Sequence, residues 1–211
     1  FNKVSGAIIG MNASLETSTL QFETLMGNAD QAREHVESLF EFAKRTPFET
    51  APIIEASRML QVFGGASLNS LKNITLFGDA AAAVSAPINE LSFWIGRAYS
   101  SIQAGRPFGE AAMRLQELAV LSPQARNEME RLQKAGASAS EVWAVMEKDL
   151  GRFTGAMERQ AGTWAGLTST LSDTIQILSA KAFKPLFQLA SNGIANLNKL
   201  LGEKSIEKGV E

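Results

Sequence analysis

The sequence predicts an all-α protein, and three observations lead to that prediction. Apolar residues recur at steps of three and four, glycines and prolines divide the chain into stretches of ordinary helix length, and no stretch alternates convincingly as a strand would. We expect a compact multi-helix domain of short helices at residues 1–153, a long amphipathic helical extension at residues 154–203 and a charged tail at residues 204–211.

Composition excludes several classes of function. With 211 residues, 45% of them hydrophobic, the chain is long enough to bury a core. Its 20 basic and 22 acidic residues give a net charge of -2, so no overall positive field attracts a nucleic-acid backbone, and we expect no sequence-specific nucleic-acid binding. The chain has no cysteine, which excludes disulfides, thiolate metal sites and cysteine nucleophiles.

The sequence contains neither a signal sequence nor an uninterrupted apolar stretch long enough to cross a membrane. Because the first residue is Phe1 rather than methionine, we expect a soluble fragment of a longer protein. The most apolar C-terminal stretch, residues 174–190, contains Lys181, Lys184 and Pro185. These residues favour a helix packed against protein over a membrane span.

Caps and breakers delimit the first expected helices. A helix at residues 14–26 ends at Gly27. The next starts at a capping box of Asn28 with Gln31 and ends before Thr46-Pro47, because the residue before a proline avoids the α conformation.

Two further helices are expected before residue 85. Pro52 suits the first turn of a helix that ends at Gly64-Gly65. Ser67 is expected to cap the next, whose small residues at 78–83 favour close packing against a neighbour.

The rest of the domain is punctuated in the same way. Pro87 opens a helix that ends near Gly105, and Ser122-Pro123 is a cap followed by a first-turn proline. Gly136 closes the helix that Pro123 begins, and Ser140 is expected to cap the last one. The helices expected after Gly105 span residues 110–121, 123–134 and 141–153.

An apolar stripe with an 11-residue period marks the C-terminal third. Its steps of 3, 4 and 4 suit a nearly straight helical bundle. The stripe consists of Trp164, Leu167, Leu171, Ile175, Leu178, Ala182, Leu186, Leu189, Gly193, Leu197 and Leu200. It predicts either one amphipathic helix that docks on its own domain or a surface for self-association. Pro185 either kinks this helix or separates two helices that meet near Lys184.

Residues that carry chemistry are few, and each has a structural interpretation. His35 is the single histidine, which leaves no partner for a zinc site or a base-orienting pair, and we interpret it as a surface or rim residue. The nearby carboxylates are typical of a solvated helix face: Glu34, Glu37 and Glu41. An aromatic group with Arg97 resembles a stacking platform, but a core stripe is the favoured interpretation of Phe93, Trp94 and Tyr99. We therefore expect no catalytic, cofactor or metal site.

Several sequence blocks occur in a characteristic order. They are LQFETLMG at residues 20–27, FAKRTPFE at 42–49, FGG at 63–65, FGDAAAA at 77–83, IQAGRPFGEAAMRLQEL at 102–118 and GAMERQAGTWAGLTSTLSDTIQ at 155–176. This series resembles the phage tail tape-measure family. The residues that match the pattern are Phe22, Leu25, Gly27, Phe42, Thr46, Pro47, Phe48, Gly64, Gly78, Asp79, Gly105, Gly166 and Asp173. The family's proteins are usually far longer, and this chain lacks their extended repetitive region.

The resemblance implies a structural role in a phage or prophage tail rather than an enzyme. Such proteins template tail-tube assembly, set tail length and take part in genome ejection, which implies tail-tube protein, tail assembly chaperones and tail-tip proteins as partners. The implied location is the tube lumen of the virion tail, and the host cytoplasm during assembly. The alternative is a membrane-interacting or cell-wall-active segment used during genome entry, with membrane contact confined to ejection.

Overall fold

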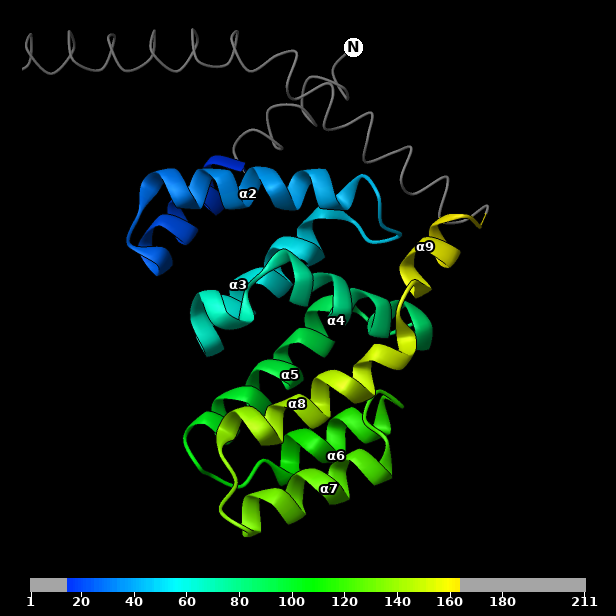
Figure 1. The fold of residues 1–211 in the computed structure, drawn as a ribbon. Helices are drawn as coiled ribbons and strands as arrows, with labels where there is room; N and C mark the ends of the chain where they lie inside the picture. The colour runs from blue at the N-terminus through cyan, green and yellow to red at the C-terminus, as the bar shows by residue number, and fades with distance from the viewer. Residues whose placement is uncertain (1–14, 164–211) are drawn as a thin grey trace, which may run out of the picture. The chain divides into compact units, whose positions relative to one another are not determined.

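The structure is a computed structural model, and it describes residues 15–163 (Figure 1). These residues contain helices and turns and no strand, which confirms the all-α prediction. From Ser18 onward these described residues belong to one compact unit. A first helix spans residues 15–26. It is followed by α2 (Ala29–Ala43), α3 (Thr50–Leu68), α4 (Leu71–Val84), α5 (Ile88–Gln103), α6 (Gly109–Glu117), α7 (Pro123–Lys134), α8 (Ala139–Leu150), the 3₁₀ turn η1 (Gly151–Phe153) and α9 (Ala156–Ala161).

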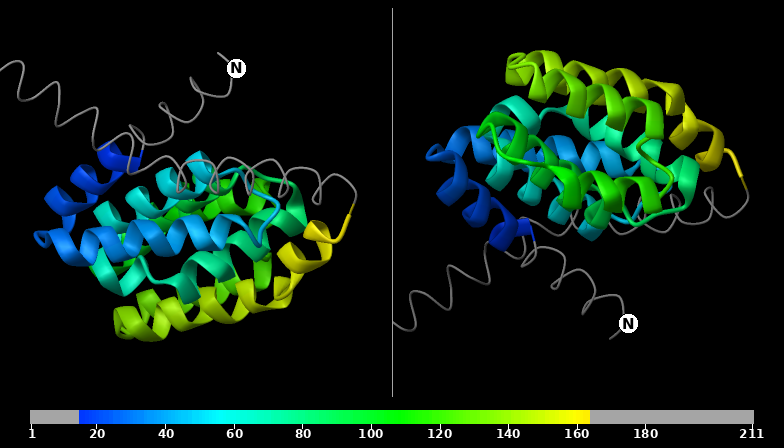
Figure 2. Two further views of the ribbon diagram at one scale, coloured as in Figure 1. Left: turned by 90° about the horizontal axis from the view of Figure 1, so that it is seen from above. Right: turned by 90° about the horizontal axis from the view of Figure 1, so that it is seen from below.

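The helix α5 is the centre of this unit, because it packs against α3, α4, α6 and α8. Figure 1 shows α2 lying over α3 at one end of the stack and α6 and α7 at the other, and Figure 2 shows the same layers from above and below. The inner face of α5 carries Leu91, Ile95 and Ala98, which are fully buried and recur at steps of four and three.

Three glycines shape the crossing of α3 and α5. A Cβ on Gly96 would lie 2.4 Å from Cδ2 of Phe63, and a Cβ on Gly64 would lie 2.7 Å from Cε1 of Tyr99. Gly65 adopts φ 58° and ψ -152°, a conformation that is essentially restricted to glycine. The two helices therefore approach closely, and α3 kinks where it passes α5.

Several predicted helix ends are confirmed. Asn28 caps α2, since its Oδ1 accepts a hydrogen bond from the Gln31 backbone N–H at 2.9 Å. Ser122 caps α7 with Pro123 in the first turn. Gly27, Gly105 and Gly136 have positive φ angles where their helices end, as expected of glycine caps.

Two predicted caps are wrong. The helix α4 is capped by Ser70 rather than Ser67, because α3 continues through the kink at Gly65 as far as Leu68. The helix α8 is capped by Ser138 rather than Ser140. Only Ser138 stands three residues before Glu141, which is the spacing that a capping box requires.

The helix predicted at residues 110–121 is shorter than expected. It ends at Glu117 because Ala119 adopts a positive φ of 58° and turns the chain back. The backbone N–H groups of Val120 and Leu121 then both donate to the carbonyl oxygen of Leu115. The helix predicted at residues 141–153 is also shorter at its C-terminal end, because α8 ends at Leu150 and is followed by the 3₁₀ turn η1.

Candidate functional site

Asp79 is a buried carboxylate in the middle of α4, and its partners come from the far end of the described chain. It is only 5% exposed. Its Oδ2 accepts a hydrogen bond from the Gly155 N–H and its Oδ1 accepts one from the Met157 N–H, both at 2.9 Å. These donors lie at the start of α9, where backbone N–H groups have no acceptor within the helix. Asp79 therefore caps a helix that begins 77 residues later in the chain, at Ala156.

The charge of Asp79 suits this position. Among residues 15–163 it forms no ion pair, and its carboxylate accepts from two backbone N–H groups. A helix N-terminus carries a partial positive charge, and hydrogen bonds to an ionised acceptor are stronger than neutral ones. The residue at the N-cap position of α9 is Gly155, which has no side chain that could supply the acceptor itself.

Gly78 provides the space that α9 occupies. A Cβ on Gly78 would lie 2.5 Å from Sδ and 3.0 Å from Cε of Met157. The Met157 side chain is therefore seated directly on the α4 backbone, and it is 5% exposed. Figure 1 shows α9 beside α4 after the chain leaves α8. We call Gly78, Asp79, Gly155 and Met157 the α9 anchor.

A second carboxylate holds the segment just before α9. Asp149, near the end of α8, accepts hydrogen bonds from the backbone N–H of Ser122 at 2.7 Å and from its hydroxyl at 2.9 Å. The same carboxylate pairs with Arg152, whose Nη2 donates to the carbonyl oxygen of Val120 at 2.8 Å. These bonds tie the end of α8 to the start of α7.

His35 takes part in a side-chain cluster that links α2 to α3. Its Nε2 lies 2.7 Å from the Ser57 hydroxyl and 3.1 Å from Nδ2 of Asn69. The Ser57 hydroxyl donates to Oδ1 of Asn69 at 2.8 Å, and Nδ2 of Asn69 donates to Oε1 of Gln61 at 3.1 Å. The imidazole also lies edge-on to the ring of Phe22 at 5.0 Å. Burial lowers the pKa of His35, because desolvation disfavours the charged ring.

This cluster is not the geometry of a nucleophilic site. Ser57 is fully buried, so its hydroxyl is closed to a substrate. The described part of the cluster also contains no carboxylate to orient the imidazole, as a catalytic triad requires. It is a partly buried polar network in which each side chain has a partner, and such networks stabilise one specific packing arrangement.

A core stripe was the favoured interpretation of Phe93, Trp94 and Tyr99, but all three side chains are only partly buried. The guanidinium carbon of Arg97 lies 5.6 Å and that of Arg114 5.9 Å from the ring centroid of Trp94. Each arginine also pairs with a carboxylate, Arg97 with Glu110 at 2.8 Å and Arg114 with Glu117 at 2.7 Å. Because both positive charges are matched locally, this surface lacks the uncompensated charge that binds a phosphate backbone.

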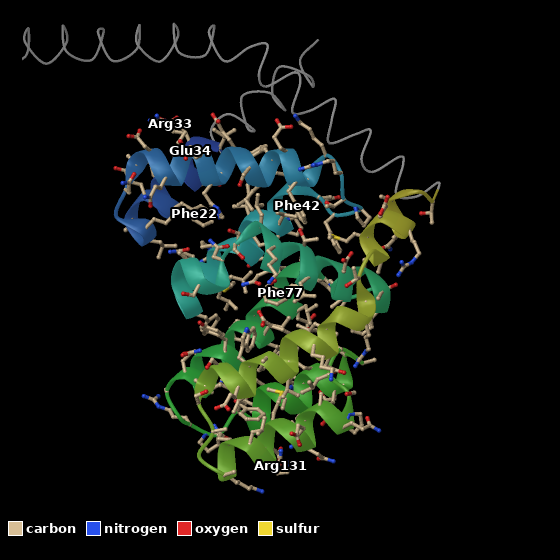
Figure 3. The ribbon with its side chains drawn as sticks, viewed as in Figure 1. Phe22, Arg33, Glu34, Phe42, Phe77 and Arg131 are labelled. Atoms are coloured by element: carbon tan, nitrogen blue, oxygen red, sulfur yellow. The ribbon has the colours of Figure 1, made fainter. Side chains whose placement is uncertain are left out.

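The residues that carried the resemblance have different roles in the structure. Phe22, Phe42 and Thr46 are buried, Pro47 and Phe48 are partly buried, and Leu25 is 39% exposed. Figure 3 shows Phe22, Phe42 and Phe77 pointing into the helical stack, whereas Arg33 and Glu34 point away from it. Gly105 lies in an exposed turn. Outside the described residues lie Gly166, Asp173 and the stripe residues Trp164, Leu167, Leu171, Ile175, Leu178, Leu186, Leu189 and Leu197.

Within residues 15–163, no group of three or more histidine, aspartate or glutamate side chains could hold a metal ion. None of the helices described is both long and apolar enough to cross a membrane. In the comparisons with known proteins, no protein-family model, no curated protein and no solved structure matches the chain.

Proposed function

We propose that the chain is part of a tail tape-measure protein of a phage or prophage, a structural component that templates the tail tube, sets its length and takes part in genome ejection. In this proposal it acts inside the tail and is not an enzyme. Its partners are the tail-tube protein, the assembly chaperones and the tail-tip proteins.

One observation supports this proposal beyond the order of the sequence blocks. The blocks FGDAAAA at residues 77–83 and GAMERQAGTWAGLTSTLSDTIQ at residues 155–176 are far apart in the sequence, yet Asp79 of the first accepts hydrogen bonds from Gly155 and Met157 at the start of the second. A chance set of short matches would not be expected to pair in this way. The first block and the start of the second therefore pack together, which is a physical reason for them to occur together.

The role that the resemblance implies is compatible with the physics of a helical ruler. An α-helix rises about 1.5 Å per residue, so a long helical chain has a reproducible length along which tube subunits can polymerise. The helices of residues 15–163 are short and folded back on one another. We therefore assign them to a folded domain attached to the ruler, and we assign the start of helical association to the stripe that begins at Trp164.

The proposal is tested in the replicon that encodes the chain. A stop codon in place of Gln21 is expected to abolish tails or to give tubes of no fixed length in electron micrographs. A synonymous change at the same codon is the matched control. Tails of normal number and length in the stop-codon strain would rule the function out.

A tag tests whether the chain enters the particle. It is inserted in the exposed turn at Gly105 and Arg106, away from the buried core. Immunoblots of purified tails are expected to detect it. If the tagged strain assembles normal tails from which the tag is missing, the chain is not a component of them.

Self-association is tested by light scattering on the full chain. Replacing Leu178 and Leu186 by glutamate places charges in the stripe and is expected to convert an oligomer to a monomer. The control replaces Ser179 by glutamate, outside the stripe. If the unaltered chain is a monomer at every concentration, the stripe packs within its own chain.

A further inference from the structure

We propose that α9 is a releasable clasp: the α9 anchor holds the start of the C-terminal segment onto α4, and it opens while α2 to α8 stay folded. This inference goes beyond the proposed function and does not depend on it, because it concerns an equilibrium within the purified chain.

The first step is that α9 has almost no stability of its own. It contains six residues, Ala156–Ala161, far below the length at which an isolated helix persists in water. Glycines stand at both of its ends, and the N-terminal one, Gly155, has a positive φ of 79°. Only Ala156 and Met157 are buried. The helix therefore forms because Asp79 supplies acceptors to its first turn and because Met157 packs on Gly78.

The second step is that the rest of the domain does not need α9. Among the described residues the main contacts of α9 are with α4, whereas α5 holds α3, α4, α6 and α8 together. The chain just before α9 has its own attachment, since Asp149 bonds to Ser122 and Arg152 to Val120. Loss of the α9 anchor therefore stops at η1 and leaves the core in place.

The third step concerns what opening does to Asp79 and Met157. Opening removes both hydrogen-bond donors from Asp79 while the carboxylate is still on α4, and it exposes the Met157 side chain. Once α9 leaves, water can donate hydrogen bonds to the Asp79 carboxylate, so opening does not leave a buried carboxylate without donors. Local opening of this kind, below the free energy of global unfolding, is a general property of segments with few buried contacts.

The test is hydrogen–deuterium exchange on the full chain with Asp79→Asn. The amide keeps the shape of the carboxylate but replaces one acceptor by a donor that faces a backbone N–H. Exchange of the amides of residues 157–162 is expected to accelerate at least tenfold, while the buried face of α5 keeps its protection. The matched control is Glu158→Gln, which removes one negative charge from the exposed side of α9 and is expected to change exchange there less than threefold.

A second variant, Met157→Ala, loosens the clasp from the side of α9 and leaves α4 unaltered. It is expected to accelerate exchange in the same residues only. Unchanged protection of residues 157–162 in both variants would overturn the proposal. If Asp79→Asn loses protection throughout the domain, Met157→Ala decides: local loss supports the clasp, and loss across α5 as well shows that α9 belongs to one cooperative core.

Discussion

Gly64→Ala adds one methyl group at the crossing of α3 and α5, and the structure leaves it no room. The new Cβ would lie 2.5 Å from Cβ of Leu68 and 2.7 Å from Cε1 of Tyr99. The Leu68 Cβ is attached directly to the backbone, so no rotamer change moves it away. The Tyr99 ring lies edge-on to Trp143, with 4.9 Å between ring centroids, and a movement of Tyr99 disturbs that contact.

The expected magnitude is the difference of two effects. Overpacking a core destabilises a protein by about 1–3 kcal/mol, whereas replacing a glycine inside a helix by alanine stabilises it by about 1 kcal/mol. Because one of the overlapping atoms is a Cβ, we take the upper end of the range and expect a net loss of about 2 kcal/mol. For a chain of this size that is a decrease in Tm of about 4–8 °C.

Urea unfolding followed by circular dichroism measures this loss. The matched control is Gly109→Ala at the start of α6, where an added Cβ would have no atom within 4 Å. This control is expected to be neutral or to stabilise by up to about 1 kcal/mol. If both variants have the same free energy of unfolding as the unaltered chain, the inferred close approach at Gly64 is wrong.

Three other predictions follow from single side chains. Burial lowers the pKa of His35, so its contribution to the free energy of unfolding should be complete above pH 6.5, the ordinary pKa of histidine, and should be lost as the pH falls below that value. The variant His35→Gln should remove this part of the pH dependence of the urea midpoint. Phe22→Ala should cost about 3–5 kcal/mol in urea unfolding, since the ring is fully buried, and a cost below about 1 kcal/mol would contradict its core position. Ser138→Ala should cost about 1 kcal/mol of thermal stability and Ser140→Ala much less, because only Ser138 caps α8; equal effects would contradict that assignment.

Local rules were enough for most of the helices, because the information lies within a few residues of each end. Asn28, Ser122 and the glycines at 27, 105 and 136 were predicted from sequence and act as predicted. The errors at Ser67 and Ser140 are also local. In each case another serine stood two or three residues away, and the choice depended on a kink or on the spacing to a glutamate.

The pairings between distant residues could not be predicted in this way. Asp79 stands in a run of small residues that indicates only close packing, and nothing near it in sequence points to Gly155. The cluster of His35 with Ser57, Gln61 and Asn69 joins residues that are up to 34 positions apart. A single histidine in the sequence does not indicate that its side chain belongs to such a cluster. Such contacts depend on topology, which periodicity does not specify.

Some of the residues that carried the resemblance stand where the backbone accepts few alternatives. Gly27 needs a positive φ, Gly64 and Gly78 each face an atom closer than 3.0 Å to an added Cβ, and Asp79 caps a helix that has no capping side chain of its own. These positions of the sequence pattern are therefore explained by backbone geometry, without reference to function. If the proposed family is correct, its other members should therefore pair the aspartate of the Phe-Gly-Asp block with backbone N–H groups at the start of the helix that leads into the C-terminal segment. A member of the family in which that aspartate faces solvent would break the link between the two blocks on which the proposal depends.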